Sequence, residues 1–210
     1  MRVIQPTKRE VEIKLRIDDL SKALSDLRQL GAKPRGRVLE RNTIYDTPDR
    51  ALYSSARLLR LRVETPAPAN QCSGGAGRAI LTSKSSPSRT ATPASRRGRY
   101  KERLEREVPV RDERLWPAIF HFLGFRSRFC YDKYRTSFRL SGLHLDLDET
   151  PVGTFLELEG VPRAIDRVAR ALGFLPRHYI RGTYWDLYVQ YCRRHGRAPR
   201  DMVLLTKKSS

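Results

Sequence analysis

Charged side chains recur at a spacing of two along six segments of the sequence. Successive side chains of a β-strand point to opposite faces, so each segment would carry its charges on one face and apolar residues on the other. Like charges on one strand face repel each other unless something neutralises them. The six sets are Glu10, Glu12 and Lys14; Arg60 and Arg62; Arg103, Glu105 and Glu107; Lys133 and Arg135; Asp146 and Asp148; Glu157 and Glu159.

These pairs suit two kinds of ligand. Carboxylate oxygens are the ligands that Mg²⁺ and Mn²⁺ prefer, and guanidinium and ammonium groups bind phosphate oxygens. A solvated outer face is the more frequent explanation for any single strand of this kind. The six together favour one inner surface that binds a metal and a polyphosphate, with the apolar faces outside under helices.

The alternation also predicts the elements that position these residues. Strands are expected at about 8–17, 35–46, 57–64, 79–82, 100–109, 126–140, 143–149 and 154–160. Helices are expected from Asp18 or Asp19 to Gly31, over 112–123, from Pro162 to Gly173 and over 183–195. About eight strands with few helices between them predict an α+β fold: an antiparallel sheet that closes into a barrel, because closure removes exposed edges.

The charge is strongly basic but unevenly distributed. The 210 residues carry a formal net charge of +19, of which residues 66–100 supply +6 and residues 193–210 supply +5. This favours an anionic partner, although the rest of the chain is only mildly basic. We expect one domain over 1–195, a flexible insert at about 66–99 around a short strand 79–84, and a basic disordered tail at 196–210.

Two further observations bear on location. The three cysteines show no metal-ligand spacing, and their odd number favours a reducing compartment. No segment approaches the roughly 20 apolar residues that a membrane span needs. The sequence therefore predicts a cytoplasmic protein without a membrane partner.

The first charged strand, Glu10-x-Glu12-x-Lys14, resembles the signature of the CYTH family, also called triphosphate tunnel metalloenzymes. The resemblance spans about residues 8–190, and seven elements occur in the family's order. The later ones are Tyr45-Asp46-Thr47-Pro48-Asp49, Leu59-Arg60-Leu61-Arg62, Lys84, Arg103-x-Glu105-x-Glu107, Lys133-x-Arg135, and Asp148-Glu149-Thr150-Pro151 with Gly153-x-Phe155-x-Glu157-x-Glu159.

The resemblance implies a closed eight-stranded antiparallel barrel that forms a tunnel, and it implies roles for the residues that match. One or two Mg²⁺ or Mn²⁺ ions would be held by Glu10, Glu12, Asp148, Glu157 and Glu159. The triphosphate would be bound by Lys14, Arg60, Arg62, Lys84, Arg103, Lys133 and Arg135, with Lys14 and Lys84 also catalytic. Glu105 and Glu107 would be further ligands or would orient the basic residues.

Three functions fit these motifs. One is metal-dependent hydrolysis of inorganic tripolyphosphate or a nucleoside triphosphate, and another is class IV adenylate cyclase activity, which converts ATP to cyclic AMP and pyrophosphate. The motifs do not separate these two. The resemblance makes thiamine triphosphate a less expected substrate. Family members that hydrolyse it carry a tyrosine just before the Tyr-Asp-Thr-Pro turn, and this chain has Ile44 at that position.

The third function is a polyphosphate- or RNA-binding module without catalysis. The basic insert and the stretch Arg193-Arg194-His195-Gly196-Arg197 favour it. The absence of an aromatic stacking motif and the many acids among the bases argue against it.

Overall fold

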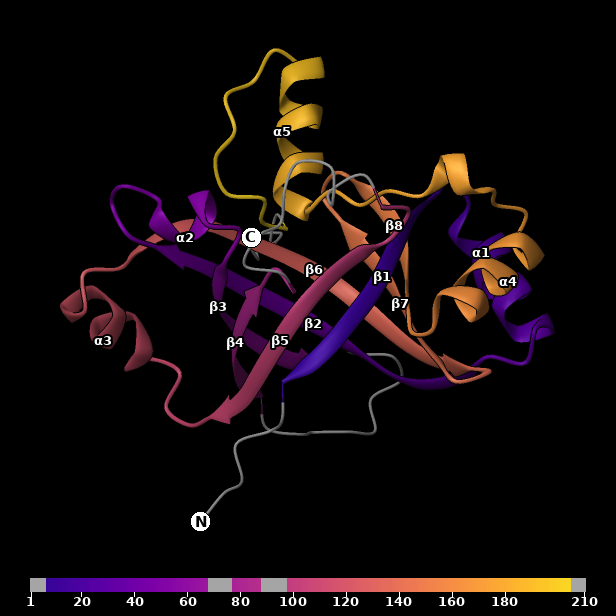
Figure 1. The fold of residues 1–210 in the computed structure, drawn as a ribbon, viewed down its shortest axis with the longest axis horizontal. Coiled ribbons are helices and arrows are strands. Elements are labelled where there is room, and N and C mark those ends of the chain that lie inside the picture. The colour runs from indigo at the N-terminus through magenta and orange to yellow at the C-terminus, as the bar shows by residue number, and fades with distance from the viewer. Residues whose placement is uncertain (1–6, 68–76, 88–97, 205–210) are drawn as a thin grey trace, which may run out of the picture.

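Eight strands form a closed antiparallel barrel in the order β1-β5-β4-β3-β2-β6-β7-β8, which confirms the predicted fold class (Figure 1). The computed structural model describes residues 7–67, 77–87 and 98–204. The strands are β1 (Lys8–Ile17), β2 (Lys33–Asp46), β3 (Leu58–Pro66), β4 (Arg78–Ser85), β5 (Lys101–Val110), β6 (Arg126–Leu140), β7 (Leu143–Thr150) and β8 (Gly153–Glu159). The helices are α1 (Leu20–Gln29), α2 (Ala51–Ser54), α3 (Trp116–Phe122), α4 (Pro162–Ala171) and α5 (Tyr184–Arg194), with a 3₁₀ turn at Pro176–His178.

The largest hydrophobic core lies outside the barrel, between its sheet and two helices. Ile13 and Leu15 of β1 are fully buried and belong to one cluster with Leu27 of α1 and Ile165 of α4. In Figure 1, α1 and α4 lie together on one side of the barrel. Because the apolar face of β1 points outward to these helices, its alternate residues must point into the barrel.

Helix α1 begins and ends as the sequence predicts. The Asp19 side chain accepts a hydrogen bond of 2.9 Å from the backbone N–H of Lys22, which caps the first turn. After the helix, Gly31 has a φ of +81°, a left-handed conformation that glycine adopts at little cost.

Helices α3 and α5 cover other parts of the barrel (Figure 1). Phe120 of α3 packs with Tyr45 and Leu61 on the outer side of β2 and β3, and the two rings lie 4.6 Å apart. Helix α5 is capped by Thr183 and Asp186, whose side chains and backbone N–H groups bond reciprocally. Its first residue, Tyr184, is buried in a cluster with Phe129, Tyr131 and Phe155.

One predicted helix begins later than expected, and one helix is not predicted at all. Helix α3 begins at Trp116 rather than at 112, because Asp112 has a φ of +50° and Pro117 occupies the first turn, where proline is tolerated. Helix α2 is not predicted from the sequence. It forms because the Asp46 carboxylate accepts hydrogen bonds from the backbone N–H groups of Leu52 and Tyr53, both 2.9 Å long.

The predicted disordered tail over 196–210 is wrong for its first part. Met202 is buried and forms an isolated parallel bridge with Tyr131. Its N–H and C=O bond to Cys130 and Asp132 of β6, and Asp201 accepts a bond of 2.8 Å from the Cys130 N–H. The predictions of flexibility at 68–76, 88–97 and 205–210 lie outside the described residues. No described helix is long and apolar enough to span a membrane.

A charged tunnel as the candidate functional site

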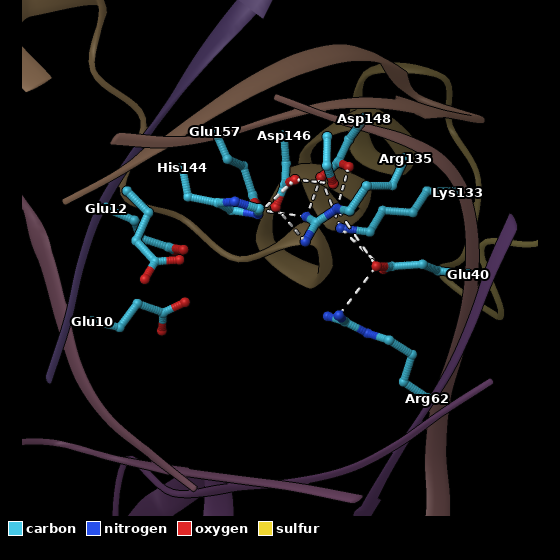
Figure 2. A network of polar contacts seen from close by, with 12 residues as sticks. Glu10, Glu12, Glu40, Arg62, Lys133, Arg135, His144, Asp146, Asp148 and Glu157 are labelled. Carbon is cyan, nitrogen blue, oxygen red and sulfur yellow. Dashed lines mark hydrogen bonds and ion pairs between the residues drawn. The ribbon is translucent and has the colours of Figure 1, made fainter. Parts of the chain in front are cut away.

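The predicted charged faces, with the exception of Glu159, line the inside of the barrel, which we call the tunnel. The register places residues of opposite sign side by side on neighbouring strands: Lys14 lies opposite Glu157, and Lys84 lies opposite Glu105. Figure 2 shows the tunnel with several of these side chains converging on its interior. The buried members are Glu10, Glu12, Lys14, Glu40, Arg60, Arg62, Glu105, Lys133, Asp146 and Asp148.

One side of the tunnel is rich in carboxylates. We call it the acidic wall; its members come from β1, β7 and β8 and are Glu10, Glu12, Asp146, Asp148 and Glu157. Lys14 Nζ lies 3.1 Å from Glu12 Oε1 and 3.0 Å from Glu157 Oε1. Burial alone would lower the pKa of Lys14, but these two carboxylates raise it above its usual value. A lysine ammonium thus neutralises two acids that the resemblance assigns to a metal.

The pKa values of Glu10 and Glu12 are shifted in opposite directions. Burial and the neighbouring Glu12 raise the pKa of Glu10 to about 6, even though Lys84 Nζ lies 2.7 Å and 2.8 Å from its two oxygens. Burial would also raise the pKa of Glu12, but Lys101 and Lys14 hold it below the usual range. Lys101 Nζ is 2.6 Å from Glu12 Oε1. The contact with Lys84 therefore does not fully offset the effects of burial and Glu12 on Glu10, whereas Lys101 and Lys14 do offset the effect of burial on Glu12.

Asp148 is the centre of a compact set of contacts on the same wall. It is fully buried, and its Oδ2 accepts from Lys133 Nζ at 2.7 Å and from the Tyr184 hydroxyl at 2.6 Å. Arg135 donates to both Asp148 oxygens, at 2.7 Å and 2.6 Å, and also contacts Asp146 at 2.8 Å and Glu157 at 2.6 Å. Such short charge-assisted hydrogen bonds fix the guanidinium plane.

A second part of the tunnel lining is less fully paired. We call it the arginine wall; it comprises Arg60 and Arg62 of β3 and Arg103 of β5, and Arg103 lies directly beside Glu10 of the acidic wall. Arg60 Nη2 lies 3.1 Å from Thr82 Oγ1 and 3.3 Å from Glu107 Oε1. The Nε atoms of Arg60 and Arg103 are buried and have no hydrogen-bond partner within the described part of the chain. A buried donor without a partner is costly, so these two groups are available to an acceptor such as a phosphate oxygen.

Helix α5 covers the tunnel with Tyr184. The ring lies 4.8 Å from Lys133 Nζ and 5.4 Å from Lys14 Nζ, within the range of cation–π attraction. Burial and the nearby Asp148 raise the pKa of Tyr184 well above its usual value, so the phenol stays protonated and donates to Asp148. The N-terminal end of α5 therefore packs against the acidic wall and stabilises its central carboxylate.

The structure brings most predicted site residues together. The predicted phosphate-binding residues and four of the five predicted metal ligands line the tunnel, whereas Glu159 contacts the largely exposed Lys8 at its edge. The remaining acids of β5 contact bases: Glu105 Oε1 lies 2.9 Å from Lys84 Nζ, and Glu107 contacts Arg60. These contacts favour the role of orienting basic residues over that of metal ligands.

The donor chemistry of the acidic wall fits a divalent cation, because carboxylates cluster there and Glu10 and Glu12 repel each other. As the side chains lie, however, no group of three His, Cys, Asp or Glu residues within 7–67, 77–87 and 98–204 is close enough to hold a metal ion. Their oxygens contact lysine and arginine nitrogens instead. A metal would therefore have to replace ammonium contacts such as those of Lys14 and Lys101.

Three residues of the site are not predicted from the sequence. Glu40 is fully buried among the cations of β3 and β6, and Lys101 contacts Glu12. Both could have been found, since Glu40 lies two residues before the inward Asn42 and Lys101 begins the series that continues with Arg103. Tyr184 gives no such signal, because its position depends on how α5 docks.

The comparisons with known proteins agree with this geometry. The model of the CYTH domain matches residues 8–172. A Methanocaldococcus jannaschii protein named "Putative adenylate cyclase" is 26% identical over 189 residues, which cover 85% of this chain and 97% of the relative. A Vibrio parahaemolyticus structure with the same description has a TM-score of 0.67 and 19% identity, covering 86% of this chain and 97% of that one.

A Hippeastrum protein has a TM-score of 0.54 and 20% identity, covering 90% of this chain and 97% of that one. It is described as an adenylyl cyclase candidate that reveals a dominant triphosphatase activity. At these identities, the two solved structures show that the fold is shared.

Proposed function

Because the chain belongs to the CYTH domain family, we propose that it is a metal-dependent enzyme that hydrolyses a triphosphate inside the tunnel. Its substrate would be inorganic tripolyphosphate or a nucleoside triphosphate. The observation that carries this proposal is the pair of buried guanidinium N–H groups of Arg60 and Arg103, which have no partner among the described residues and belong to a tunnel that is also lined with carboxylates. Such a surface suits an anion and a cation bound side by side.

We assign the phosphate contacts to seven basic residues. Each would donate to nonbridging phosphate oxygens, and the guanidinium groups can do so with two parallel N–H groups. Lys14 and Lys84 would in addition stabilise the charge that develops on the reacting phosphoryl group. The set is Lys14, Arg60, Arg62, Lys84, Arg103, Lys133 and Arg135.

Mg²⁺ or Mn²⁺ would be held by Glu10, Glu12, Asp148, Glu157 and Glu159. Such an ion neutralises phosphate charge and lowers the pKa of a bound water. Lys14 now neutralises Glu12 and Glu157, and it would be freed to contact phosphate when another cation takes that role. The protein's own contribution is to orient the triphosphate and to shield it from bulk water within the barrel.

Adenylate cyclase activity is the second candidate. The names of the Methanocaldococcus jannaschii and Vibrio parahaemolyticus proteins favour it, whereas the description of the Hippeastrum protein favours hydrolysis. Both reactions need the same triphosphate site. A binding module for RNA is less well supported, since buried carboxylates such as Glu12 and Asp148 would repel a phosphate backbone.

The test is an assay of the purified full chain with Mg²⁺ or Mn²⁺, offering tripolyphosphate and ATP separately. Orthophosphate, pyrophosphate and cyclic AMP are then resolved. We expect orthophosphate release from tripolyphosphate, and loss of metal binding in Glu10→Ala. Cyclic AMP from ATP would establish the second candidate. No product from either substrate, together with unchanged metal binding in Glu10→Ala, would rule out the enzyme.

A further inference from the structure

Glu40 is a buried carboxylate at the junction between the two walls (Figure 2). Strand β2 lies between β3 and β6, so its inward side chains reach cations on both neighbours. Glu40 Oε1 lies 3.1 Å from Arg62 Nη1 and 3.6 Å from Arg135 Nε, and Oε2 lies 3.4 Å from Lys133 Nζ. One acid thus contacts three of the residues that are proposed to bind phosphate.

These contacts are looser than those of Asp148. Asp148 receives four hydrogen bonds of 2.6–2.7 Å, the usual length for charge-assisted pairs. In contrast, Glu40 Oε1 is buried without a hydrogen-bond partner among the described residues, and Asn42 Nδ2 approaches Oε2 only to 3.5 Å. Glu40 therefore neutralises its cations mainly through charge, without fixing them in a tight hydrogen-bonded geometry.

Glu40 nevertheless stays ionised. Burial alone would raise its pKa, but the surrounding cations, Arg135 first among them, hold the pKa below its usual range. A carboxylate oxygen among guanidinium and ammonium groups has the same charge and acceptor chemistry as a phosphate oxygen. The position of Glu40 is therefore one at which the protein's own anion and a phosphate would seek the same donors.

We propose that Glu40 is a built-in counter-anion, which keeps Arg62, Lys133 and Arg135 together in the free protein and competes with the triphosphate for them. This inference rests on the proposed function, because it needs a polyphosphate as the competing anion. Glu40 is a positioning residue that sets affinity. Without it, three buried cations repel one another; with it, an incoming phosphate meets a nearby negative charge. The same residue therefore stabilises the free protein and weakens ligand binding.

The substitution Glu40→Gln separates these two effects, because it removes the charge at nearly constant shape. We expect the ligand-free variant to unfold at a lower temperature than the wild type. We also expect it to bind inorganic tripolyphosphate on the order of tenfold more tightly, since juxtaposed like charges are strongly unfavourable in a closed site. Ligand binding stabilises the folded state. Tripolyphosphate should therefore raise the melting temperature of Glu40→Gln by more than it raises that of the wild type.

The matched control is Glu64→Gln. Glu64 Oε1 lies 3.4 Å from the same Arg62 Nη1, but its side chain is 19% exposed and it contacts no other tunnel cation in the described residues. We expect Glu64→Gln to bind tripolyphosphate with the affinity of the wild type, and tripolyphosphate to raise the melting temperature of the two proteins equally. Titration calorimetry without metal measures binding separately from turnover, and thermal unfolding measures both stability shifts.

A second variant covers the case in which Glu40→Gln does not fold. Glu40→Asp keeps the charge and shortens the side chain, so we expect lower stability with unchanged tripolyphosphate affinity; tighter binding in Glu40→Asp would overturn the inference. Wild-type affinity in Glu40→Gln, with an unchanged ligand-induced shift, would overturn it while leaving the proposed function intact. Absence of tripolyphosphate binding and turnover in the wild type would instead overturn both.

Discussion

The buried charged groups of the two tunnel walls differ in how completely they are paired with groups of the protein. On the acidic wall, the oxygens of Asp148 and Glu12 contact lysine or arginine nitrogens at 2.6–3.1 Å. On the arginine wall, Arg60 and Arg103 each keep one buried N–H without a partner in the described part of the chain. The free protein thus neutralises its carboxylates with its own cations and leaves some of its arginine donors for an anion. Under the proposed function, the acidic wall would supply the metal ligands, and the unpartnered donors of the arginine wall would add to the phosphate contacts of Lys14, Lys84, Lys133 and Arg135.

Removal of metal tests this assignment of roles most severely. Dialysis against a chelator should reduce triphosphate turnover to background, since the cation that the carboxylates would bind is then absent. Binding of tripolyphosphate should persist, because the arginine wall supplies its donors without metal. Turnover and calorimetric binding are measured on the same preparation, and added Mg²⁺ or Mn²⁺ should restore turnover. If binding disappears together with turnover, the two walls do not act separately.

Arg60→Ala should produce the next largest effect. Loss of one preorganised donor to a developing negative charge typically costs about 10²- to 10³-fold in rate. We expect kcat/KM for the triphosphate to fall by roughly that factor, with weaker tripolyphosphate binding and unchanged metal affinity. The control is Arg9→Ala, whose side chain points out of the barrel, is 65% exposed and contacts Glu102. Equal losses in both variants would contradict a specific role for the arginine wall.

Much of this comparison can be predicted from the sequence, because strand faces follow a simple period of two. Glu10, Glu12 and Lys14 lie on one face whatever the fold, and their apolar neighbours require helices outside the barrel. What the period cannot provide is the pairing across strands. The contact of Glu40 with both Arg62 and Lys133 depends on β2 lying between β3 and β6, an order that no local pattern encodes.

Residues that reach the tunnel from outside the barrel are still harder to predict. Tyr184 resembles an ordinary apolar residue of an amphipathic helix, yet docking of α5 places its hydroxyl on Asp148. Likewise, the segment at Met202 has a composition typical of a flexible tail, and backbone bonds to Cys130 and Asp132 hold it against β6. Both positions depend on tertiary packing, which overrides local propensity.

Tyr184→Phe should have a smaller effect, and it tests how much the Tyr184 hydroxyl stabilises Asp148 on the acidic wall. The substitution removes only the hydroxyl that donates to Asp148 at 2.6 Å. A hydrogen bond to a charged group contributes about 1.5–3 kcal/mol, so we expect the free energy of unfolding to fall by about 2 kcal/mol. The control is Tyr191→Phe on the same helix. Denaturant unfolding measures both, and an effect no larger than that of the control would show that Lys133 and Arg135 already satisfy Asp148.

The pH dependence of Glu10 should give the smallest effect, and it tests whether burial and Glu12 outweigh the contact of Glu10 with Lys84. The pKa of Glu10 is raised to about 6 from an ordinary value of 4.5, so the folded protein binds the proton more strongly than the unfolded chain does. The resulting stabilisation is complete below about pH 4.5 and is lost as pH rises through about 6. Glu10→Gln does not titrate. Its stability relative to the wild type should therefore increase by about 1.5 kcal/mol between pH 4.5 and 7.

The size of that increase is independent of the lost contact with Lys84, because the lysine keeps its charge throughout this pH range and contributes a constant offset. Thermal unfolding in the presence of chelator measures the difference between Glu10→Gln and the wild type at each pH. Saturating Mg²⁺ should abolish the rise, since a bound cation removes the repulsion between Glu10 and Glu12 that contributes to the raised pKa. A difference that falls with pH would mean that Lys84 outweighs burial and Glu12 and holds the pKa of Glu10 below its ordinary value.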